Sequence, residues 1–359
     1  MAQVSPLAPF AGQFFSGAEV LEVAAGNLFA LVDALDKLGP GFGEDAALRA
    51  AFAVDGVMQT DWSAPLAPDA QVMLFPRVAG GSAMADTLPF RTLSPFGVEL
   101  SCDLAAPLSE PQQDHFRDLF NRHSLILARG QSLSMQRQRE ICGLLGPILD
   151  RPGEQGTMTN EGGGYAASAL SWHADAAYTE HPFDALSLHA LDVAEGASST
   201  RFVSAQDACD TLPGEIRTAL DGQTQEMIAP HYTRLAERTC DQRDPEAQKR
   251  GILPTIYTNP HNGRACLWVG ELQTTRLLGM EWEASRDLLH AAFDYFYAPE
   301  RVFEHRWRNG DFIVWDNIAL QHERGNLEAV GTRVLQRAIV GTHGVAPHIA
   351  VAADTASAD

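Results

Sequence analysis

The chain has 359 residues, of which 45% are hydrophobic and 20% charged, the composition of a globular protein. This length allows two domains, or one large domain with an extension. Its 26 basic and 46 acidic residues give a formal net charge of −20. Such a charge repels nucleic-acid backbones and anionic membrane surfaces, so neither is expected as a partner. It still allows a small anionic substrate held by a local arginine.

The sequence also bears on the cellular compartment. No apolar run approaches the ~20 residues that a membrane-spanning helix needs. Residues 1–10 lack the basic segment and apolar stretch of a secretory signal. The five cysteines are scattered and form no C-x-x-C pair, which favours reduced thiols over disulfides or a structural zinc site. We therefore expect a cytoplasmic protein.

Residues 1–93 are expected to form a small, mostly helical extension. Apolar residues recur at helical spacing over residues 16–38, and Ser16 is suited to cap that helix. Residues 44–54 have the pattern of a second, short helix, and only residues 71–75 resemble a strand. We find no motif in this segment that would carry chemistry.

The pattern changes after residue 93. Helical patterns at residues 109–121 and 134–145 precede a region in which strand patterns dominate. Many short strands flanked by helices favour a β-sandwich or barrel with helical decoration, an α+β fold. We assign residues 94–345 to this domain and expect residues 346–359, which are small and polar, to form a flexible tail. The clearest expected strands are residues 185–193, 200–204, 255–258, 265–269, 302–307, 311–315 and 333–341.

Two separated motifs carry chemistry. His173 and Asp175 form an H-x-D pair, and residues i and i+2 of a strand point to the same face, so imidazole and carboxylate converge. His322 follows an apolar strand and a turn and could supply a third ligand. Two imidazoles and one carboxylate are the facial triad of non-haem Fe(II) oxygenases. The triad leaves open the coordination positions that a bidentate 2-oxo acid and O₂ require.

Arg333 strengthens this interpretation. It lies eleven residues after His322, at the start of an expected strand. A guanidinium there can pair bidentately with a carboxylate deep in a barrel. The second carboxylate of 2-oxoglutarate requires such a partner.

Together the motifs resemble the taurine dioxygenase / 2,4-dichlorophenoxyacetate dioxygenase family of Fe(II)/2-oxoglutarate-dependent oxygenases. The resemblance covers residues 94–343 and rests on W-H-A-D at 172–175, W-D-N-x-x-x-x-H at 315–322, Arg333 and Arg337. It implies a double-stranded β-helix (jelly-roll) core and the use of Fe(II), 2-oxoglutarate and O₂. The implied site residues are His173, Asp175 and His322 for iron, Thr200 and Arg333 for the distal carboxylate of 2-oxoglutarate, and Arg337 for the anionic group of the substrate.

The sequence departs from the taurine branch of that family. The loop at residues 147–152 holds no histidine, and Ala169 stands where an asparagine is expected. Taurine is therefore not the expected substrate. Trp172, Tyr178 and Phe202 are candidates for the substrate pocket, with aromatic packing in the core as the alternative.

The predicted function is that of a dioxygenase acting on a small, anionic organic substrate. It would couple decarboxylation of 2-oxoglutarate, giving succinate and CO₂, to hydroxylation or hydroxylation-driven bond cleavage. Two other interpretations stay open: a non-catalytic jelly-roll binding protein, and a cupin-like protein with another metal. The complete triad together with Arg333 speaks against the first, and the second would not need Thr200 and Arg333. A homo-oligomer is left open.

Overall fold

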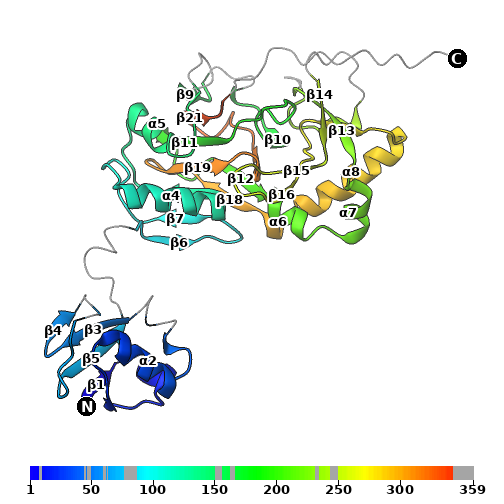
Figure 1. The fold of residues 1–359 in the computed structure, drawn as a ribbon. Coiled ribbons are helices and arrows are strands. Elements are labelled where there is room, and N and C mark those ends of the chain that lie inside the picture. Colours follow the sequence, from blue (N-terminus) through cyan, green and yellow to red (C-terminus); the bar gives the residue numbers. More distant parts are fainter. Residues whose placement is uncertain are drawn as a thin grey trace. The chain divides into compact units, whose positions relative to one another are not determined.

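The computed structural model describes residues 1–7, 10–43, 46, 50–59, 62, 64–76, 87–149, 156–161, 166–230, 234–242 and 250–342. The expected tail at 346–359 lies outside these residues. The chain divides into two compact units, residues 1–86 and 87–359 (Figure 1). This division falls seven residues before the expected boundary after residue 93. None of the helices in the described ranges is long and apolar enough to cross a membrane.

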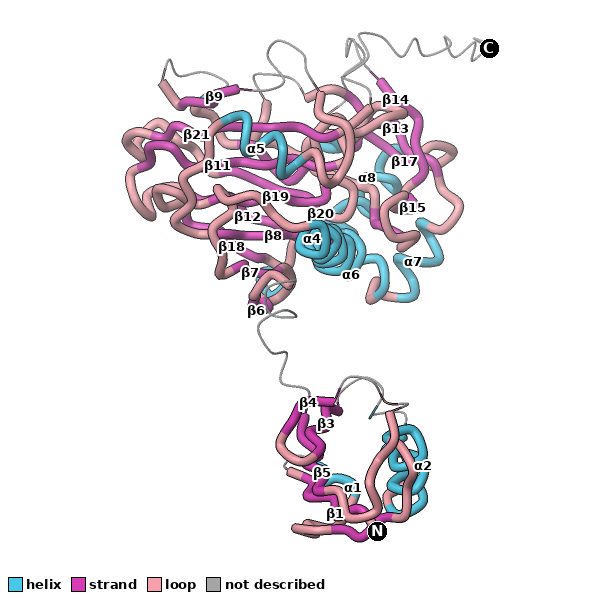
Figure 2. Tube along the Cα trace, turned by 60° about the vertical axis from the view of Figure 1, so that its left-hand side comes forward, coloured by secondary structure: helices cyan, strands magenta, loops and turns pink. Residues whose placement is uncertain are grey.

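The N-terminal unit is built around a five-stranded sheet (Figure 2). Its elements are β1 (Ala2–Pro6), α1 (Phe10–Phe14), β2 (Leu21–Val23), α2 (Leu28–Leu38), β3 (Ala50–Val54), β4 (Val57–Gln59) and β5 (Gln71–Pro76). The strand order is β2-β1-β5-β3-β4, with β1 and β5 parallel and the other neighbours antiparallel. Leu31 and Leu35 of α2 share one hydrophobic core with Val4, Phe52 and Leu74 of the sheet.

The expectation of a mostly helical extension is wrong. Within residues 16–38 the helix begins only after Asn27, whose side chain accepts a hydrogen bond from the Ala30 N–H at 2.8 Å, and part of the preceding segment forms β2. The end of the second expected helix is strand β3, which pairs with β4 on one side and β5 on the other. An apolar run as short as that of β3 fits helix and strand equally well. Pairing with two neighbouring strands decides between them.

Two sheets dominate the second unit. The seven-stranded sheet has the order β6-β7-β8-β19-β11-β21-β9, and the four-stranded sheet has the order β10-β20-β12-β18. The first comprises β6 (Phe90–Thr92), β7 (Val98–Leu100), β8 (Leu125–Ala128), β9 (Gly156–Thr159), β11 (Ala185–Val193), β19 (Phe312–Asp316) and β21 (Arg333–Val340). The second comprises β10 (Leu170–His173), β12 (Ser199–Ser204), β18 (Phe303–Arg306) and β20 (Leu320–Arg324). The strand expected at residues 185–193 is confirmed as β11.

Alternation along the strands separates two cores. Phe312 and Val314 of β19 share a core with buried residues of helices α4 (Glu110–His123) and α5 (Met135–Cys142). The intervening residues, Ile313 and Trp315, belong to a different core that also holds Phe202 of the four-stranded sheet. Because successive strand residues point to opposite faces, this second core lies between the two sheets. The candidate site is built at that inner face.

The remaining elements lie on the other side of the four-stranded sheet. They are α6 (Ala205–Asp210), α7 (Gly214–Leu220), β13 (Thr224–Ile228), β14 (Arg250–Pro254), β15 (Ile256–Thr258), β16 (Ala265–Leu267), β17 (Thr274–Leu277) and α8 (Trp282–Phe296), with short 3₁₀ turns at Thr239–Asp241 and Pro299–Arg301. Their core includes Trp268, Phe293 and Phe296, together with Trp172 and Val203 from the outer face of the four-stranded sheet. Figure 1 shows α7 and α8 next to each other at the right-hand end of this unit.

Candidate active site

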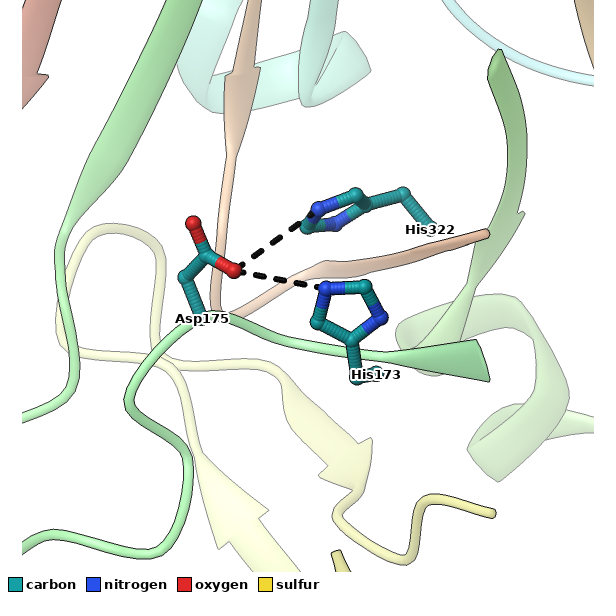
Figure 3. A group of neighbouring side chains, drawn as sticks. All are labelled: His173, Asp175 and His322. Carbon is teal, nitrogen blue, oxygen red and sulfur yellow. Dashed lines mark ion pairs between the residues drawn. The ribbon is translucent and has the colours of Figure 1, made fainter. Parts of the chain in front are cut away.

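Backbone pairing brings the two expected histidine ligands together. His173 at the end of β10 is the register partner of His322 on the antiparallel strand β20. Asp175 lies two residues beyond the end of β10, and its Oδ1 lies 3.4 Å from Nε2 of His173 and 3.9 Å from Nε2 of His322 (Figure 3). One ligand atom from each of the three residues lies within 4.8 Å of the other two. The sheet thus gathers the three side chains that the sequence singles out.

The protonation states suit a cation. The Nδ1 atom of His173 lies 2.7 Å from the Ser171 carbonyl oxygen, which can only accept, so Nδ1 carries a proton and Nε2 is the ring nitrogen that faces Asp175. Burial, and the neighbouring His173, lower the pKa of His322 to about 3, which keeps this imidazole neutral. Burial alone would raise the pKa of Asp175, but the neighbouring imidazoles of His173 and His322 and the charge of Arg337 hold it well below its usual value. The carboxylate is therefore ionised.

Asn317 fixes the backbone of Asp175, a role that sequence reasoning missed. Its side-chain carbonyl accepts from the Asp175 N–H at 2.8 Å, and its amide donates to the Asp175 carbonyl at 2.9 Å. Asp316 shapes the turn that places Asn317, because its Oδ1 accepts from the N–H groups of Ile318 and Ala319 at 2.8 and 2.9 Å. The polar pair after Trp315 in the W-D-N motif was the available signal.

A cavity of about 100 Å³ opens beside the triad. Apolar walls come from both sheets, and polar and charged side chains converge on the space between them. The lining residues are Met158, Leu170, His173, Asp175, Leu186, Leu188, Thr200, Trp315, His322, Arg324, Arg333 and Arg337. Thr200, Arg333 and Arg337 are thus brought to the triad, and Arg324 is a lining residue that the sequence analysis did not single out.

Arg333 and Thr200 are linked through Trp307. The Trp307 Nε1–H donates to Oγ1 of Thr200 at 3.0 Å, and the Arg333 guanidinium carbon lies 6.0 Å from the Trp307 ring centroid. Arg333 is 3% exposed, and its Nε has no hydrogen-bond partner among the described residues. Burial, and the charge of Arg324, lower its pKa to about 10, so the guanidinium stays protonated near neutral pH.

The structure places the three aromatic candidates outside the cavity lining. Trp172 precedes His173 in β10 and points to the other face, where it stacks on Tyr297 with ring centroids 4.9 Å apart. Tyr178 belongs to the same outer core. Phe202 is on the inner face but packs behind the site, with its ring centroid 6.1 Å from that of His322. All three fit the packing alternative.

A sequence model described as "Taurine catabolism dioxygenase TauD, TfdA family" matches residues 89–339. The chain belongs to this family. The match confirms the expected enzyme class, a 2-oxoglutarate-dependent dioxygenase that uses O₂ and acts on a small organic molecule. It covers the unit that holds the cavity and begins after the N-terminal unit ends.

Curated relatives of the chain share this class. It is 26% identical over 280 residues to an alpha-ketoglutarate-dependent 2,4-dichlorophenoxyacetate dioxygenase of Cupriavidus pinatubonensis, covering 70% of this chain and 95% of the relative. It is 26% identical over 260 residues to an alpha-ketoglutarate-dependent sulfate ester dioxygenase of Pseudomonas putida, covering 67% of this chain and 83% of the relative.

Solved structures share the fold. A taurine dioxygenase from Burkholderia xenovorans superposes with a TM-score of 0.60 at 19% identity, covering 72% of this chain and 92% of that chain. The enzyme AAD-2, solved with Mn(II) and N-oxalylglycine, gives a TM-score of 0.59 at 20% identity, covering 72% and 98%. At these identities the likeness speaks for the fold alone, a mixed α/β fold with many strands.

Proposed function

We propose that the protein is an Fe(II)/2-oxoglutarate-dependent dioxygenase that oxidises a C–H bond of a small organic anion. His173, Asp175 and His322 would hold the iron, Arg333 and Thr200 would bind the distal carboxylate of 2-oxoglutarate, and Arg337 would meet the anionic group of the substrate. The observation that carries the proposal is the convergence of two imidazoles, one carboxylate and the buried Arg333 on one cavity.

The donor set fits Fe(II). Two imidazole nitrogens and one carboxylate oxygen within 4.8 Å of one another match the two-histidine, one-carboxylate triad of non-haem iron sites. The hydrogen bond from His173 to Ser171 is the outer contact that orients a ligating imidazole. When bound, the iron together with 2-oxoglutarate and O₂ supplies the oxidising power, and 2-oxoglutarate leaves as succinate and CO₂.

The chain's own groups bind and orient the reactants. Thr200 accepts from Trp307, so its hydroxyl proton is left to donate to a carboxylate, and Arg333 offers a buried charge beside it. The two facing sheets support the expected double-stranded β-helix core, in which the cavity occupies the space between them.

The cavity lining also supports the substrate class. Arg337 faces Leu188 across β21 and β11, and Leu186, Met158 and Trp315 supply further apolar wall. An arginine beside an apolar wall suits a molecule with one anionic end and an apolar body. The relatives named above act on an aryloxyacetate and on sulfate esters, which have this character.

A succinate assay tests the proposal. The full chain with Fe(II), ascorbate, O₂ and 2-oxoglutarate is screened with aryloxyalkanoates, alkyl sulfates, sulfonates and amino acids. We expect one of the amphiphilic anions to stimulate succinate formation and to be oxidised. Metal binding with no conversion of 2-oxoglutarate would favour the non-catalytic jelly-roll alternative, and turnover independent of 2-oxoglutarate would favour the cupin-like one.

A further inference from the structure

Arg324 lies beside Thr200 on the inner face of the four-stranded sheet. Strands β12 and β20 pair with Phe202 opposite His322 and Arg201 opposite Glu323. The same antiparallel register, continued by one residue, sets Thr200 opposite Arg324. Since alternate residues share a face, Arg324 and Thr200 point to the same side as His322. This explains why both line the cavity.

Arg324 is held in this position. It is only 9% exposed, and its Nη2 donates to the Ser168 carbonyl at 3.0 Å, just before β10. On its other edge β20 pairs with β10, and Leu170 of β10 is the register partner of Arg324. Arginine carries five donors in a fixed fork, so one guanidinium can contact the backbone and a bound anion at the same time.

Two like charges therefore meet at this part of the cavity. Arg333, 3% exposed, has an Nε without a hydrogen-bond partner among the described residues, and the positive charge of Arg324 acts on it. Neighbouring buried cations repel each other, and an anion between them removes that penalty. A carboxylate has about four lone-pair sites and can accept from two guanidinium groups and a hydroxyl at once.

We propose that Arg324 is a second binding residue for the distal carboxylate of 2-oxoglutarate, completing a three-sided cradle with Arg333 and Thr200. This inference rests on the proposed function, which assigns Arg333 and Thr200 to that carboxylate. It assigns a role to a residue that the H-x-D, W-D-N and arginine motifs do not include.

The test compares two oxo acids by calorimetry on the full chain loaded with Mn(II). 2-Oxopentanoate has the carbon skeleton of 2-oxoglutarate with a methyl group in place of the distal carboxylate. The ratio of its Kd to that of 2-oxoglutarate therefore measures recognition of this carboxylate alone. For Arg324→Gln we expect the ratio to fall by roughly tenfold to a hundredfold, the range for a hydrogen bond to a charged group. Arg324→Lys, which keeps a point charge and loses the fork, should give an intermediate ratio.

Arg201→Gln is the matched control. Arg201 follows Thr200 directly in β12, so its side chain points to the outer face of the sheet, where it pairs with Glu323. The ratio should therefore stay at the wild-type value in this variant. Because both acids need the same metal and keto-acid contacts, a general loosening of the site leaves the ratio unchanged. An unchanged ratio in either folded Arg324 variant would overturn the inference. A wild-type protein that binds neither acid in the presence of Mn(II) would instead overturn the proposed function.

Discussion

His173 and His322 are register partners across the antiparallel pair of β10 and β20, and their ring centroids lie 4.3 Å apart. Residues far apart in the chain are thus placed by backbone hydrogen bonding and not by a flexible loop. The third member, Asp175, lies two residues beyond His173, and its backbone is fixed by Asn317. Backbone pairing and the hydrogen bonds of Asn317 thus hold the three side chains close together, which would reduce the ordering needed to bind a metal.

Arg333→Ala should impair 2-oxoglutarate binding specifically. It removes the buried cation proposed to bind the distal carboxylate, at a cost of roughly 2–5 kcal/mol. The KM for 2-oxoglutarate should rise by orders of magnitude, whereas the affinity for Fe(II) changes little because Arg333 is not a ligand. Steady-state kinetics with varied 2-oxoglutarate checks this, and an unaltered KM would reject the role.

Arg337→Gln should weaken binding of the substrate and leave binding of 2-oxoglutarate unchanged. The variant keeps much of the side-chain length and removes the charge, so an anionic substrate should lose roughly 1.5–3 kcal/mol of affinity. Decarboxylation of 2-oxoglutarate without substrate should persist, since Arg333 is intact. Arg306→Gln, a change in an exposed ion pair with Glu304, serves as the control. Turnover of the preferred substrate that ignores Arg337→Gln would refute the assignment.

Asn317→Ala should weaken metal binding without unfolding the chain. Both hydrogen bonds to the Asp175 backbone are lost, and loss of such outer contacts typically lowers metal affinity about 10–100-fold. Asn309→Ala is the matched control, because Asn309 makes a comparable 2.8 Å contact to the backbone N–H of Val193, which is not a triad residue. Equal metal affinities for the two variants, measured by titration with Mn(II), would argue against this positioning role.

The pair of His261 and Asp316 predicts a pH-dependent stability. Nδ1 of His261 lies 2.9 Å from Oδ2 of the buried Asp316. Burial alone would lower the pKa of His261, but the hydrogen bond and charge of Asp316, with Asp184, raise it above its usual value. A raised pKa in the folded state means that the contribution is complete below the unfolded pKa near ~6.5 and is lost as pH rises through the folded value.

Urea denaturation at about pH 5.5 and about pH 8.5 measures this contribution. The difference in free energy of unfolding between wild type and His261→Gln should be larger at the lower pH. Taking this difference at each pH cancels the contribution of the other titrating groups, because both proteins contain them. A difference that grows toward alkaline pH would contradict the ion pair.

Sequence reasoning succeeded where a motif and an alternating strand coincide. His173, Asp175, His322, Thr200, Arg333 and Arg337 all reach the cavity. Trp172 did not, although alternation from His173 could have indicated its outward direction. Arg324 was missed because its significance depends on the register of β20 with β12, which a sequence does not specify. Residues 50–54 were mistaken for helix because their short apolar run is decided only by pairing with strands β4 and β5.

The most direct test of the central claim is to measure 2-oxoglutarate consumed and succinate formed in Fe(II)-loaded wild-type and His322→Ala proteins side by side. In the wild type, the amount of succinate formed should equal the amount of 2-oxoglutarate consumed, and the reaction should depend on O₂. His322→Ala should lose iron binding and all turnover, while its thermal unfolding midpoint stays close to that of wild type. Full iron-dependent turnover by His322→Ala would contradict the assignment of the metal to His173, Asp175 and His322.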